Sequence, residues 1–99
     1  MLKNITLEQL EKMLRRENPY WQESAYPMCA QRMKDTMDER LEEAVIAFAQ
    51  DGTCMDVREG EFSISGIRKL KHCSFLDALF LMDDYMKNAR LGRMRIMRR

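Results

Sequence analysis

The most reactive side chains of this sequence are those of three cysteines and one histidine. Cys29, Cys54 and Cys73 are widely spaced, and His72 stands directly before Cys73. These four residues are all types that zinc accepts, and a neighbouring cysteine and histidine could also form a nucleophilic pair. The sequence has no C-x-x-C or H-x₃-H pair, and adjacent residues rarely both reach one tetrahedral ion. We therefore expect no structural metal and no cofactor.

Catalytic motifs are also missing from the sequence. It contains no phosphate-binding glycine loop, no G-x-S-x-G and no H-E-x-x-H. The single histidine and the apolar neighbours of the cysteines are typical of turn and core residues. The sequence therefore predicts a protein that binds rather than an enzyme.

Two clusters of basic residues could bind a polyanion. Residues 1–86 contain eleven Lys or Arg and sixteen Asp or Glu, whereas residues 87–99 contain six basic residues and no acidic one. If the tail lies beside the cluster at 68–72, together they form a patch whose phosphate binding would depend steeply on salt. The alternatives are a solvated tail, or a tail paired with acidic residues of the body. The candidate polyanion-binding residues are Arg68, Lys69, Lys71, Arg93, Arg95, Arg98 and Arg99.

A strongly apolar helix is predicted from residue 75 onward. The segment 75–84, FLDALFLMDD, is apolar on most of its circumference and anionic elsewhere. Such a helix is either the centre of the fold or part of an interface. In so small a chain one helix is rarely enclosed on all sides, so we expect Leu76, Phe80 or Leu81 to contact a protein partner or a second copy of the chain.

Helical periodicity and capping residues predict four helices. Thr6 and Gln9 form a capping box at the first, Gly52 ends the second, and Ser63 or Ser65 begins the third. Ser74 begins the fourth, after a turn at residues 72–74. The predicted ranges are 6–17, 27–50, 63–71 and 74–89, followed by a basic tail at 90–99.

Two short strands are also predicted. Residues 54–58 could form one, with Gly60 in the turn after it, and the partial alternation of residues 93–98 is typical of an edge strand. The predicted fold class is therefore mainly α, a single four-helix domain with a possible two-stranded ribbon. Its order of helix, strand, short helix, turn, helix and strand resembles that of a winged helix. The anionic side chains of the fourth helix argue against reading of DNA bases by that helix, because they would repel phosphates.

The segment 17–27, ENPYWQESAYP, gathers three of the aromatic residues. A ligand surface is one interpretation, but the glutamates on both sides of the aromatic residues disfavour stacking of nucleic-acid bases. We instead expect Tyr20 and Trp21 to cover the junction of the first two helices, with Tyr26 setting the start of the second.

Length and composition set the remaining expectations. A chain of 99 residues, 45% hydrophobic and 33% charged, is enough for one folded domain. Charges near the N-terminus, the lack of a long apolar run and the odd number of cysteines predict a cytoplasmic protein that is not inserted in a membrane. The leading hypothesis is a small intracellular interaction or regulatory protein, in which a homodimer is one option. The alternatives are a nucleic-acid-associated protein with a winged-helix-like fold and a mobile-element inhibitor that docks on a host nucleic-acid enzyme.

Overall fold

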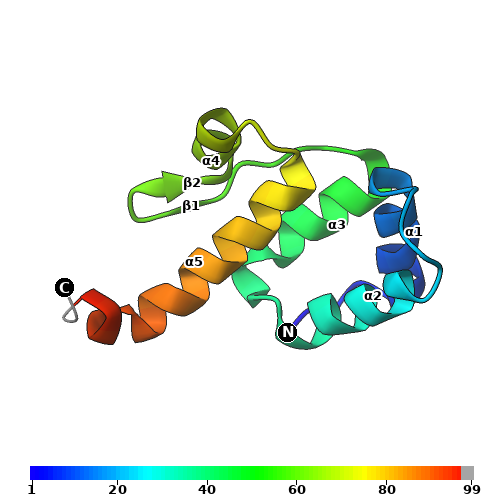
Figure 1. The fold of residues 1–99 in the computed structure, drawn as a ribbon, viewed down its shortest axis with the longest axis horizontal. Coiled ribbons are helices and arrows are strands. Elements are labelled where there is room, and N and C mark those ends of the chain that lie inside the picture. Colours follow the sequence, from blue (N-terminus) through cyan, green and yellow to red (C-terminus); the bar gives the residue numbers. More distant parts are fainter. Residues whose placement is uncertain (97–99) are drawn as a thin grey trace. The chain divides into compact units, whose positions relative to one another are not determined.

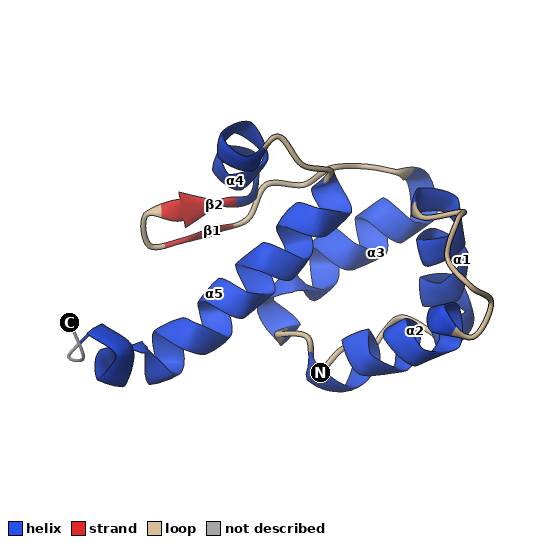
Figure 2. Cartoon of the chain, viewed as in Figure 1, coloured by secondary structure: helices blue, strands red, loops and turns tan. Residues whose placement is uncertain are grey.

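The computed structural model describes the backbone of residues 1–96 and the side chains of residues 1–88. These residues form helices α1 to α5 and one two-stranded antiparallel sheet (Figures 1 and 2), so the predicted mainly α class with a short ribbon is confirmed. The chain divides into two compact units, residues 1–55 and 56–99. The prediction of a single domain stays a prediction.

The first unit begins with α1 (Leu7–Glu17), which starts where the sequence predicts. The side chain of Thr6 accepts the backbone N–H of Gln9, and the Gln9 side chain accepts the backbone N–H of Thr6. This capping box satisfies two donors that a helix start leaves unpaired. Ile5 before the cap and Leu10 in the second turn are both buried, as a hydrophobic staple requires.

The predicted helix over residues 27–50 is broken in two, and the cause is a buried aspartate. It consists of α2 (Ala25–Thr36), a 3₁₀ turn η1 (Glu39–Leu41) and α3 (Glu42–Asp51). Met37 and Asp38 adopt extended backbone angles, and the Asp38 carboxylate accepts the backbone N–H of Arg40 and pairs with its guanidinium. Asp38 therefore caps the start of a new helical segment. The apolar periodicity continues across this position and gave no sign of the interruption.

Two charged side chains of α2 and α3 bind the segment that precedes α1. Lys34 donates through Nζ to the backbone carbonyls of Leu2 and Ile5. A carboxylate oxygen of Glu42 accepts the backbone N–H groups of Lys3 and Asn4. These two charged side chains therefore hold the segment before α1, in which Leu2 and Ile5 are buried.

The aromatic segment matches the prediction at two of its three rings. Tyr26 is buried and its hydroxyl donates to the Asn18 carbonyl, while Trp21 stacks on it with ring centroids 5.6 Å apart. Tyr20 is 79% exposed, so the prediction that it covers the helix junction is wrong. Residues 18–24 form turns before α2 begins, and this path leaves the Tyr20 ring in solvent.

The second unit begins with a hairpin that supports two helices. Strands β1 (Arg58–Glu59) and β2 (Phe62–Ser63) pair around a turn in which Gly60 has a φ of 61°. The strand therefore lies later than the predicted 54–58, but the turn at Gly60 is confirmed. Ser63 then caps α4 (Ile64–Lys71), and Ser74 accepts the backbone N–H of Asp77 at the start of α5 (Phe75–Ile96).

The C-terminal part of α5 contradicts two predictions. The helix runs through Gly92 to Ile96, so the predicted end near 89 is wrong, and so is the edge strand predicted at 93–98 over its residues 93–96. Residues 97 and 98 of that strand lie outside the described residues. Extending a helix that already exists needs no new nucleus, and Arg and Met favour it, so one glycine at a cost of about 1 kcal/mol does not end it. In the predicted winged-helix-like order a strand follows the last helix, but here α5 continues to Ile96 and both described strands lie before α4.

Candidate functional site

The second unit contains an apolar cleft between α4, β2 and α5, which we call the α4–α5 groove. Its volume is about 440 Å³. Apolar and aromatic side chains make up most of its lining, and polar groups lie among them. The lining residues are Glu61, Phe62, Ser63, Gly66, Ile67, Leu70, Lys71, Leu81 and Tyr85.

Three large apolar side chains of the groove are open to solvent. Leu70 is 73% exposed, Phe62 42% and Leu81 39%. Isolated exposed apolar residues are ordinary, whereas several gathered around one concave surface indicate a binding site. The groove is therefore the strongest candidate site in the described part of the second unit.

One wall of the groove is built by the contact between the hairpin and α5. The rings of Phe62 and Tyr85 pack in a tilted arrangement with centroids 4.3 Å apart. A Cβ atom placed on Gly60 would lie 3.3 Å from the Tyr85 hydroxyl oxygen, so the turn approaches this ring closely. The positive φ of Gly60 and this close approach both favour glycine. The wall is thus fixed by backbone geometry as well as by side-chain packing.

The other wall, α4, is fastened at its first turn. The carboxylate of Asp56 accepts the backbone N–H of Ser65 at 2.8 Å and its hydroxyl at 3.0 Å. The hydrogen bonds from Ser65, first of all the one from its backbone N–H, lower the pKa of the Asp56 carboxyl below its usual value. In the same turn, the Ser63 hydroxyl oxygen accepts the backbone N–H of Gly66. A carboxylate that accepts such bonds stabilises the helix start while it is ionised.

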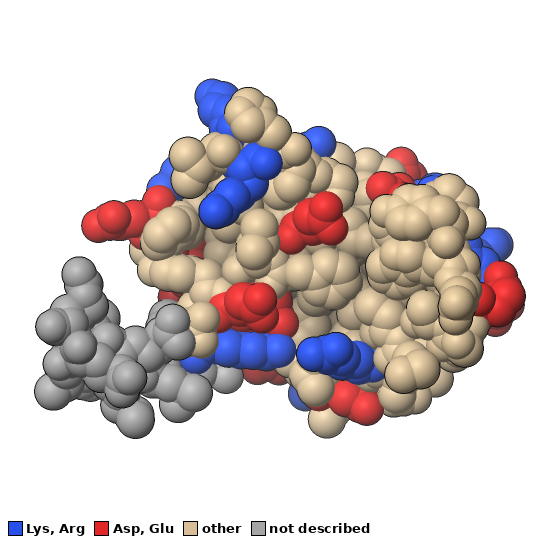
Figure 3. Space-filling model, viewed as in Figure 1, with Lys and Arg blue, Asp and Glu red and all other residues tan. Residues whose placement is uncertain are grey.

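The basic residues of the cluster predicted at 68–72 have two different surroundings. Arg68 donates to the Cys73 carbonyl and lies over the Phe75 ring, so its guanidinium is held at the turn between α4 and α5. Lys69 and Lys71 are exposed and form no ion pair within the described residues. Basic side chains accordingly gather over α4 (Figure 3). Lys71 alone of the three also lines the groove.

The remaining predicted polyanion-binding residues lie in the tail. Arg93 and Arg95 belong to the last turns of α5, and the structure gives no account of their side chains. Arg98 and Arg99 lie outside the described residues. A joint patch with the cluster on α4 therefore stays a prediction.

The three residues predicted to bind a partner have different surroundings. Leu76 is 1% exposed and so does not lie on the surface, Phe80 is half-buried, and Leu81 lines the groove. Sequence reasoning missed the contributions of Phe62 and Tyr85. Ile64, Ile67 and Leu70 recur at helical spacing along α4, but Ile64 is buried whereas Leu70 is exposed.

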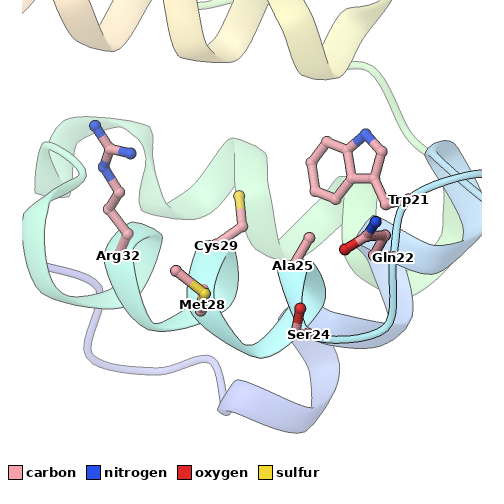
Figure 4. A pocket seen from close by; sticks show the side chains of 7 residues that line it. All are labelled: Trp21, Gln22, Ser24, Ala25, Met28, Cys29 and Arg32. Atoms are coloured by element: carbon pink, nitrogen blue, oxygen red, sulfur yellow. The ribbon is translucent and has the colours of Figure 1, made fainter.

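A second cleft of about 530 Å³ lies along α2 in the first unit. It is lined by Trp21, Gln22, Ser24, Ala25, Met28, Cys29 and Arg32. Figure 4 shows the indole, the thiol and the guanidinium on the same side of the helix, with Met28 in front of it. Burial raises the pKa of the Cys29 thiol more than the Arg32 charge lowers it, which disfavours a reactive thiolate there.

The other predicted reactive residues form no common site in the structure. Cys29, Cys54 and Cys73 are free thiols. Among residues whose side chains the structure describes, no group of three or more His, Cys, Asp or Glu could hold a metal ion. Within the same part of the chain, no helix is both long enough and apolar enough to cross a bilayer.

Comparison with known proteins adds no relative to this description. No protein-family model, no curated protein and no solved structure matches the chain.

Proposed function

We propose that this chain is a non-enzymatic protein-interaction protein that binds through the α4–α5 groove. The observation that carries the proposal is the exposure of Phe62, Leu70 and Leu81 around one concave surface. Removing such side chains from water stabilises a complex by about 25 cal/mol for each Å² of apolar area. A groove of this kind therefore gains free energy by binding an apolar surface of another protein.

The construction of the groove supports binding without a large ordering cost. Asp56 fastens the first turn of α4, and the contact of Phe62 with Tyr85 fastens the hairpin to α5. A surface whose shape is already fixed loses less conformational entropy when it binds. The groove is therefore expected to act as a preformed receptor rather than as a segment that folds on binding.

The polar groups of the groove suit an interface better than catalysis. The Ser63 hydroxyl oxygen caps α4 by accepting the N–H of Gly66, and no histidine lines the groove among the described residues. Glu61 and Lys71 are exposed, as charged residues at the rim of an interface usually are. These features support the non-enzymatic proposal.

The polyanion alternative receives less support from the same surface. Arg68 is engaged at the turn, and the exposed carboxylates of Asp77 and Asp84 lie on the helix that follows. Phosphate binding needs several cations with few anions beside them. We also propose a cytoplasmic location, which the three free thiols support, because reducing compartments keep thiols unpaired.

Site-specific photo-crosslinking in the source cells tests the proposed function. A photoreactive phenylalanine analogue at position 70 should give a covalent adduct with a protein, because Leu70 projects from the groove. The matched control is the same analogue at position 69, because Lys69 is exposed on the same helix but does not line the groove. No adduct from position 70, or equal adducts from both positions, would contradict the proposal.

A further inference from the structure

The surface of α4 carries a knob and a hole on one face. Leu70 projects into solvent, and Gly66, one turn earlier, lines the same groove without a side chain. A Cβ atom on Gly66 would meet only the Ser63 hydroxyl oxygen within 4 Å, so its outer side is open. Residues four apart share a helix face. If two copies of α4 pack antiparallel about an axis midway between Gly66 and Leu70, each leucine lies over the glycine of the other copy.

Charges at the groove follow the same pattern. Glu61 lies in the hairpin turn before α4, whereas Lys71 is the last residue of α4. Both side chains line the groove and both are exposed. The rim therefore carries one anion, from the turn that precedes α4 in the chain, and one cation, from the last residue of α4.

A twofold axis through the centre of the groove would satisfy both patterns at once. In a twofold interface, residue i of one copy contacts residue j of the other, and j contacts i in return. An axis at the level of residue 68, midway between Gly66 and Leu70, would bring each Leu70 to the other Gly66. Each Lys71 would then face the first turn of the partner's α4, which the Glu61 turn precedes in the chain. A partner of uniform charge would match only one of the two rim charges. The surface therefore fits a second copy of itself better than an acidic or a basic protein.

We propose that the occupant of the α4–α5 groove is a second copy of this chain, bound antiparallel as a twofold homodimer. This inference rests on the proposed function, since it names the partner of the same groove. It assigns Leu70 and Gly66 to the centre of the interface and Glu61 and Lys71 to its rim.

Charge reversal tests the antiparallel pairing. Lys71→Glu alone and Glu61→Lys alone each convert two attractive rim pairs into two repulsive ones, so each should weaken the dimer by about tenfold or more at low salt. An equimolar mixture of these two variants should recover the wild-type affinity as a heterodimer, because every rim pair is then attractive. Sedimentation equilibrium measures the affinity, and native mass spectrometry identifies the heterodimer.

Two further variants separate the interface from the fold. Lys69→Glu makes the same charge change outside the groove and should leave the dimer affinity within about twofold of wild type. Leu70→Asp should produce a monomer with an unchanged circular dichroism spectrum, because this side chain is largely exposed. A dimer that survives Leu70→Asp would overturn the assignment of the groove as its interface. Single charge variants that dissociate but do not pair when mixed would overturn the antiparallel arrangement.

The crosslinking result separates this inference from the proposed function. An adduct at position 70 with the mass of two chains supports both. A chain that stays monomeric at several hundred micromolar and crosslinks from position 70 to a different protein would overturn the homodimer and retain the proposed function. A monomer without any adduct would overturn both.

Discussion

The hydroxyl of Tyr26 provides a sharp test of how the aromatic segment supports the first unit. Tyr26 is 2% exposed, its ring stacks against Trp21, and the Arg15 guanidinium carbon lies 4.6 Å from the ring centroid. Replacement by phenylalanine keeps the ring and these contacts, and it removes only the bond from the hydroxyl to the Asn18 carbonyl.

The expected cost follows from what the substitution leaves behind. The Asn18 carbonyl also accepts the backbone N–H of Trp21 at 3.3 Å, so it keeps one partner after the hydroxyl is lost. Tyr26→Phe should therefore cost about 1 kcal/mol, the net contribution of one hydrogen bond, rather than the larger penalty of a buried acceptor without a partner. Tyr26→Ala also removes the buried ring and should cost about 3–5 kcal/mol.

Trp21 is the only tryptophan of the chain, and its stacking on Tyr26 makes its fluorescence a direct reporter of this region. Urea unfolding followed at its emission gives the free energy of unfolding of each variant. The matched control is Tyr20→Phe, the same change six residues earlier at a side chain that is 79% exposed, which should shift stability by less than about 0.5 kcal/mol. Equal effects of the two phenylalanine variants would refute the assignment of Tyr26 as the anchor.

Three further predictions concern the helix start, the turns and the thiols. Asp56→Asn should lower the free energy of unfolding, measured in urea at pH 7, by about 1 kcal/mol. Because folding lowers the pKa of Asp56, this difference from wild type should fade as the pH drops through and below the usual value of 3.8. Gly52→Ala should cost about 1–2 kcal/mol for its positive φ, and Gly60→Ala should cost more in thermal unfolding because a Cβ there also meets a tyrosine hydroxyl. Cys54, which is exposed, should react with iodoacetamide at pH 8 several-fold faster than Cys29, whose pKa is raised by burial, as peptide mass mapping would measure.

Local rules were sufficient for the starts of three helices, for one helix end and for one turn. Thr6, Ser63 and Ser74 each accept a backbone N–H in the first turn that follows, as expected of capping residues. Gly52 and Gly60 adopt positive φ where the sequence predicts a helix end and a turn. These features depend on a few neighbouring residues, and the sequence contains all of the information that they need.

Features that depend on distant residues could not be read in this way. The periodicity of Met33, Met37 and Leu41 correctly indicates burial. The helix is nevertheless interrupted at Asp38, whose side chain is buried and paired with Arg40. In the same way, the alternation that begins at residue 93 fits both helix and strand. Residues 93–96 continue α5, and β1 already has β2 as its partner.

The sequence by itself determined that the chain is mainly helical with a short ribbon, because capping and periodicity act over a few residues. Only the tertiary structure decided which apolar side chains remain exposed. Leu76 and Leu81 look alike on a helical wheel of apolar residues, yet one is buried and the other lines the groove. The packing of α4 and the hairpin against α5 places Phe62 beside Tyr85 and leaves Leu70 in solvent. Burial depends on such long-range packing, so the candidate site could be found only in three dimensions.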